Sequence, residues 1–140
     1  RLLRARGEDM KNVVKIYDST VTKTEKVYLC YGHKAYKKFS KKRYKAENAY
    51  IEKGAVAVLW DRHNGRYEVC IGIKKWNDPL QIKGLIVHEM SHAIDYIMRE
   101  NDLTDTEYRA YAMQSMYQIA ISFIDDVIAS KHRKSQRKKI

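Results

Sequence analysis

Residues 78–100 constrain the fold more than any other part of the chain, because they predict one long helix. Asp78 is a favourable N-cap, and Pro79 suits the first helical turn. Apolar residues then recur at helical spacing to about residue 100. The segment LIVHEMSHAIDYI at 85–97 places three chemically active side chains in this apolar frame: His88, Glu89 and His92.

The two histidines are four residues apart, so on a helix their rings project from one face and converge. That arrangement suits two adjacent corners of a zinc tetrahedron. Glu89, beside the first histidine, would act as general base towards a zinc-bound water and then as proton donor to the leaving amine. This H-E-x-x-H pattern predicts a zinc metallopeptidase. The alternative is that His88 and His92 are core histidines with ordinary hydrogen-bond partners.

A catalytic zinc needs a third protein ligand, and Glu107 is the best candidate. It opens a second helix expected at 106–130, and the small Ala110 would let the two helices approach. The alternative role for Glu107 is a favourable charge at a helix N-terminus. Asp95 lies on the same helix as the histidines, so we expect it to orient an imidazole. The remaining histidines occupy no rigid inward position that the sequence predicts: His33, His63 and His132.

The pattern HEMSH followed by EYRAY resembles the gluzincin branch of the zincin metallopeptidases. The layout is also similar to small zincin-like proteins encoded in bacteriophage and prophage genomes. The motif-bearing likeness covers about 78–120 and implies that His88, His92 and Glu107 bind Zn²⁺ while Glu89 is catalytic. It implies an α+β fold. In this fold a short, mostly antiparallel sheet with an N-terminal helix packs on the H-E-x-x-H helix and on a C-terminal helix.

The front half of the chain predicts strands and one basic helix. Strands are expected at 12–18 and 26–32, and an amphipathic helix at 33–53 that ends at Gly54. Asn64-Gly65 predicts a hairpin between 55–61 and 66–75. In zincins an edge strand aligns the peptide, and here 66–75 would take that role.

We expect one domain over 1–130, with residues 1–9 as an extension ahead of Met10 and a basic, flexible tail at 131–140. The chain carries a net charge of +11, concentrated in its flanks. These basic segments predict either contact with nucleic acid or a solvated face. They also keep open a second function, that of a non-hydrolytic zinc-binding module acting on nucleic acid or in phage assembly.

The sequence predicts a cytoplasmic protein, in a bacterial host cell if the chain is phage-encoded. Cys30 and Cys70 lie in strand-like segments without metal-site spacing, which favours two buried free thiols over a disulfide. No apolar run approaches the length of a membrane span. The expected partner is therefore a peptide or protein substrate rather than a membrane.

Overall fold

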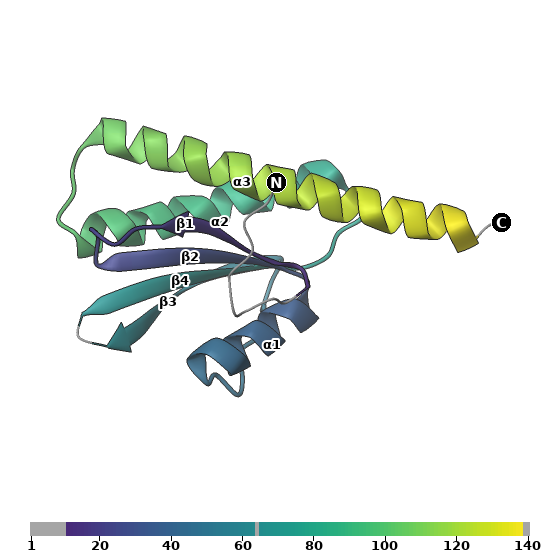
Figure 1. Ribbon diagram of the computed structural model, residues 1–140, viewed down its shortest axis with the longest axis horizontal. Helices are drawn as coiled ribbons and strands as arrows, with labels where there is room; N and C mark the ends of the chain where they lie inside the picture. The colour runs from purple at the N-terminus through teal and green to yellow at the C-terminus, as the bar shows by residue number, and fades with distance from the viewer. Residues whose placement is uncertain (1–10, 64, 139–140) are drawn as a thin grey trace.

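The computed structural model describes residues 11–63 and 65–138, and it has an α+β fold in three layers (Figure 1). A four-stranded sheet lies between one helix on one face and two helices on the other. Among the described residues, no helix combines the length and apolar character needed to cross a membrane. The elements are β1 (Val13–Asp18), β2 (Thr24–Tyr31), α1 (His33–Tyr44), β3 (Ala55–His63), β4 (Arg66–Ile73), α2 (Pro79–Glu100) and α3 (Thr106–Lys138).

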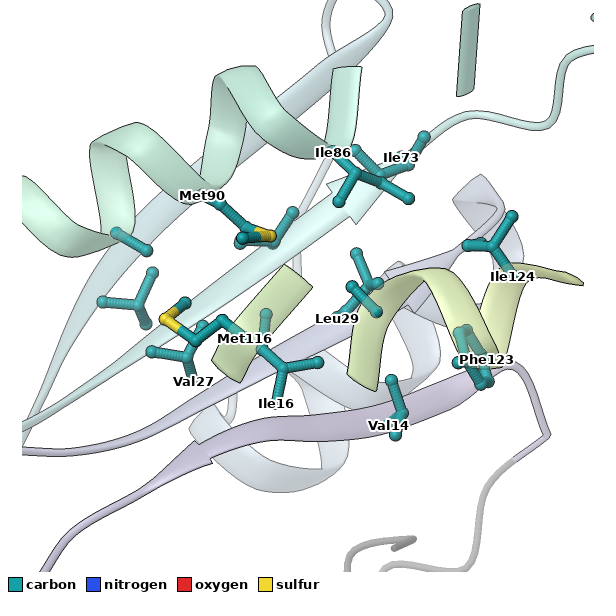
Figure 2. Packing of buried hydrophobic residues seen from close by; sticks show 14 of the residues in the cluster. Val14, Ile16, Val27, Leu29, Ile73, Ile86, Met90, Met116, Phe123 and Ile124 are labelled. Carbon is teal, nitrogen blue, oxygen red and sulfur yellow. The ribbon is translucent and has the colours of Figure 1, made fainter. Parts of the chain in front are cut away.

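Alternation along the strands divides the core into two parts, because successive side chains point to opposite faces. On one face, Val27, Leu29 and Ile71 pack beneath α2 and α3. On the other face, Tyr28 and Cys70 pack against α1. Figure 2 shows the first core, in which side chains of β1 and β2 face Ile86 and Met90 of α2 and Met116, Phe123 and Ile124 of α3.

The strand order is β1-β2-β4-β3, with β2 and β4 parallel and the two outer pairings antiparallel. The hairpin expected around Asn64-Gly65 forms, although Asn64 lies outside the described residues. The expected edge strand at 66–75 is wrong, because β4 has a partner on each side. The edge of the sheet on this side is β3.

Two predicted boundaries differ from the structure. The helix expected to reach Gly54 ends at Tyr44, where Lys45 adopts a left-handed conformation with φ 59°. This turn lets the chain return so that Ile51, fully buried, joins the core beneath α1. The expected extension at 1–9 lies outside the described residues.

The segment expected to be a flexible tail is helical as far as Lys138. Residues 131–138 are exposed at every position, so tertiary packing does not hold them in place. They are mostly Lys, Arg and Gln, which are good helix formers, and they lack Gly and Pro. Intrinsic propensity therefore extends α3 beyond the sheet (Figure 1).

The close packing of α1 on the sheet depends on Gly72 in β4. A Cβ placed on Gly72 would lie 2.6 Å from the ring of the buried Tyr36 and 3.0 Å from Ile51. We expect Gly72→Ala to lower the free energy of unfolding by about 1–3 kcal/mol, because the ring has no free space into which to move. Urea denaturation measures this change. Gly84→Ala is the control, because its Cβ would meet nothing within 4 Å; an equal loss in both variants would contradict the packing argument.

Candidate metal centre

The helix α2 holds the H-E-x-x-H motif in a fixed orientation. Asp78 caps the helix by accepting a hydrogen bond of 3.0 Å from the backbone N–H of Leu80, and Pro79 follows at the first position. The buried stripe of the helix faces the sheet and includes Ile82, Ile86, Met90, Ile94 and Ile97. His88 and His92 are exposed, on the solvent side of this stripe. The alternative of two core histidines is therefore wrong for this structure.

The two imidazole rings converge, as the spacing predicts. The Nε2 atoms of His88 and His92 are 3.3 Å apart, and the rings meet edge-on at 78° with centroids 4.9 Å apart. Two nitrogens bound to one tetrahedral zinc at about 2.0–2.1 Å would be about 3.3–3.4 Å apart. The same separation also suits a hydrogen bond in which one ring donates its N–H to the other. The separation of the two nitrogens thus matches that of two corners of a tetrahedral zinc site.

Glu89 differs sharply from its neighbour in exposure. The Glu89 side chain is 9% exposed, whereas the His88 side chain is 67% exposed. The Oε2 atom of Glu89 lies 3.9 Å from Nε2 of His88. Burial raises the pKa of Glu89, while the nearby His88 and His92 act in the opposite direction. Among the described residues, no hydrogen-bond donor is paired with this carboxylate. A poorly solvated carboxylate with a raised pKa beside a pair of histidines is chemically suited to act as a general base.

The structure does not bring Glu107 to the histidine pair. Glu107 is exposed in the first turn of α3, where its backbone N–H donates a 2.9 Å hydrogen bond to Asp105. The inward stripe of α3 contains Ala112, Met116 and Ala120. At about 100° per residue, Glu107 lies roughly opposite that stripe. Its role as a zinc ligand remains a prediction, and its position agrees with the alternative of a charge near the helix N-terminus.

Asp95 contacts a cation on the neighbouring helix rather than an imidazole. Its Oδ1 accepts a 2.7 Å hydrogen bond from Arg109 Nη1, which links α2 to the start of α3. Sequence reasoning missed this link, because opposite charges 14 residues apart carry no local pattern. The other histidines lie elsewhere: His33 at the start of α1 beside Tyr50, His63 at the end of β3 and His132 near the end of α3.

The resulting site has two converging histidine side chains and one buried carboxylate on a single helix. Across residues 11–63 and 65–138, no three His, Cys, Asp or Glu side chains gather closely enough to hold a metal ion. The pair therefore offers two ligands, and the site would need a third from a further side chain or from a bound molecule. In comparison with known proteins, the chain matches no family model, no curated protein and no solved structure.

Proposed function

We propose that the protein is a zinc-dependent metallopeptidase in which His88 and His92 hold the metal and Glu89 is the catalytic acid and base. The observation that carries this proposal is the 3.3 Å separation of the two Nε2 atoms beside a buried carboxylate. A zinc ion bound there would polarise the peptide carbonyl and lower the pKa of a water to about 7.

Glu89 provides the proton chemistry in this proposal. Its raised pKa makes it a better proton acceptor than an ordinary surface carboxylate, so it takes a proton from the attacking water. Once protonated, it can return that proton to the nitrogen of the leaving amine. Because its side chain is only 9% exposed, few bulk water molecules compete for the proton between these two steps.

The edge strand β3 is the proposed docking surface for the peptide. It pairs with β4 along one side, so its other side can add an extended peptide by backbone hydrogen bonding. A Cβ on Gly54, just before β3, would lie 3.4 Å from Leu85, one turn ahead of His88 and Glu89. The edge strand therefore begins close to the motif-bearing part of α2.

Glu107 remains the third ligand that the sequence proposes. Its position on the outer face of α3 instead favours a second candidate function, a zinc-binding module without hydrolytic activity. Such a module would use the histidine pair with a ligand from a partner, in nucleic-acid or phage-assembly interactions. The peptidase needs Glu89, whereas the zinc-binding module does not.

We place this activity in the cytoplasm, in a bacterial host cell if the chain is phage-encoded. Support comes from Cys30 and Cys70, which are buried free thiols with sulfur atoms 3.8 Å apart. A pair of unbridged thiols this close is typical of a protein kept under reducing conditions.

Metal content tests the proposal directly. Purified protein, with no zinc added, should contain about one zinc ion per chain by elemental mass spectrometry. His88→Ala and His92→Ala should each lower this content severalfold, because each removes one of two ligands. Glu107→Gln should lower it only if Glu107 is the third ligand.

The matched controls are His63→Ala and His132→Ala, which remove histidines outside the pair. They should leave zinc content unchanged. A wild-type protein that takes up no zinc, or zinc that survives in a His88→Ala/His92→Ala variant, would contradict the proposed site.

A further inference from the structure

Three adjoining hollows lie at the end of the sheet where the parallel strands β2 and β4 stop. The first, of about 620 Å³, lies between the start of α1 and residues 74–75. The second, of about 610 Å³, lies between residue 75 and the end of α3. The third, of about 270 Å³, lies beside Trp76 and the end of α3. Tyr31 lines all three, so the hollows adjoin one another around the end of β2.

The first two hollows form what we call the basic trough. Its lining includes eight cationic side chains: Lys11, Lys34, Lys38, Lys74, Lys75, Lys131, Arg133 and Lys134. Asp126 is the single carboxylate among the described lining residues. Within the described part of the chain, none of the eight cations forms an ion pair with a carboxylate. Among the described residues, the trough therefore carries a positive potential that no paired carboxylate neutralises.

The tertiary fold brings this charge together from distant segments. Lys34 and Lys38 belong to α1 on one face of the sheet, whereas Lys131 and Lys134 belong to α3 on the other. On the α1 side of the trough, the backbone is held by a 2.6 Å hydrogen bond from the Gly32 N–H to the Ile73 carbonyl. The α3 side is carried by a continuous helix, whose Phe123 and Ile124 are buried in the core before the exposed residues 131–138 begin.

Two cations of the trough, Lys11 and Lys134, line the same hollow. The proximity and positive charge of Lys11 lower the pKa of Lys134. Arg137 and Lys138 add smaller effects in the same direction. A bound anion would relieve the repulsion between these groups, because it would place negative charge between them.

We propose that the basic trough binds the phosphate backbone of a single-stranded nucleic acid, with Trp76 as a ring on which a base stacks. Each of the two hollows is larger than one phosphate group, and their cations are spread from α1 to α3, so a repeating anion fits better than a single one. Trp76 is 42% exposed and lines the third hollow with Lys131 and His132. Exposed aromatic rings beside a basic groove are typical of single-strand binding.

The shape and composition of the surface argue against a lipid bilayer as the ligand. The cations line a concave surface, whereas a bilayer needs a flat or convex one. The exposed segment 131–138 also contains no apolar residue that would enter a membrane. A single strand, by contrast, would contact both the cations and the exposed aromatic ring at this end of the molecule.

Fluorescence anisotropy with a labelled oligothymidine of about 20 nucleotides tests the proposal. The full chain should bind it more tightly than a duplex of the same length. Raising salt from about 50 mM to about 200 mM should weaken binding, with a log–log slope of about −0.7 per neutralised phosphate. The variant Lys34→Glu/Lys75→Glu/Lys134→Glu should bind at least about tenfold more weakly, and Trp76→Leu should lose most of the preference for the single strand.

The matched control is Lys23→Glu/Lys42→Glu/Lys53→Glu, which makes the same change in net charge at exposed lysines outside the three hollows. It should lose much less affinity than the trough variant, and both should keep the circular dichroism spectrum of the parent. Equal losses in the two triple variants would overturn the proposal, because they would show only diffuse attraction by net charge. Tighter binding to the duplex, or to vesicles of anionic phospholipid, would overturn it as well.

This proposal is independent of the peptidase. Glu89→Gln should bind the oligothymidine with unchanged affinity, since Glu89 lines none of the three hollows. Failure of the trough proposal would leave the zinc measurements unaffected, and failure to find zinc would leave the binding measurements unaffected.

Discussion

Glu89→Gln should abolish most peptide hydrolysis while leaving the zinc content unchanged. The amide keeps the shape of the carboxylate but cannot accept a proton from the attacking water. Loss of a general acid–base of this kind lowers the rate by about 10²–10⁴-fold. The rate can be followed by mass spectrometry on a complex mixture of peptides, which detects cleavage whatever the sequence preference of the enzyme.

Asp95→Asn is the matched control, because it also exchanges a carboxylate for an amide on α2. Asp95 contacts Arg109 and lies outside the proposed proton path, so hydrolysis should remain within a few-fold of the parent. Full activity in Glu89→Gln would contradict the metallopeptidase mechanism. A protein that binds zinc but cleaves no peptide, with or without the substitution, would support the non-hydrolytic module.

Loss of stability would not explain a loss of hydrolysis in Glu89→Gln. Burial raises the folded-state pKa of Glu89 above its unfolded value, so folding takes up a proton at this position. The free energy of unfolding therefore begins to fall as the pH rises through the pKa of Glu89 in the unfolded state. The full loss is reached above its pKa in the folded state. The metal-free Glu89→Gln variant should consequently unfold at an equal or higher temperature than the parent at neutral pH. In strong acid, where the carboxyl is protonated in both states, the difference should disappear.

Glu68→Ala should destabilise the domain by about 3–5 kcal/mol, the largest stability effect that we expect. Glu68 is 2% exposed in β4, beneath the end of α1. Arg43 donates two hydrogen bonds to its carboxylate, from Nε at 2.6 Å and from Nη2 at 2.7 Å. The Tyr44 hydroxyl donates a third, at 3.0 Å. Removing the carboxylate would leave a partly buried guanidinium without its strongest partner.

Chemical denaturation of the two proteins measures this loss. Glu25→Ala is the matched control, because Glu25 also pairs with an arginine, Arg66, but at 3.4 Å and with both side chains more exposed. That pair should contribute no more than about 1 kcal/mol. A similar loss in both variants would show that burial of the Glu68 pair adds nothing to its strength.

The sequence by itself determined the local elements and the motif. Helix α2 was predictable at both ends, since Asp78 and Pro79 define its start and the apolar spacing continues to Glu100. The convergence of His88 and His92 was predictable for the same reason, because four residues on a helix bring two side chains together whatever surrounds them. These features depend on interactions within one segment.

Tertiary structure alone decided which segments distant in the sequence became neighbours. The parallel pairing of β2 with β4 places β4 inside the sheet and β3 at its edge, and strand periodicity does not encode that order. The face of α3 that packs inward fixes Glu107 on the outside, although the sequence made it the best third ligand. The basic trough joins the start of α1 to the end of α3, two segments about a hundred residues apart. Local propensity acts over a few residues, whereas these positions depend on how the sheet and helices bury their apolar faces against one another.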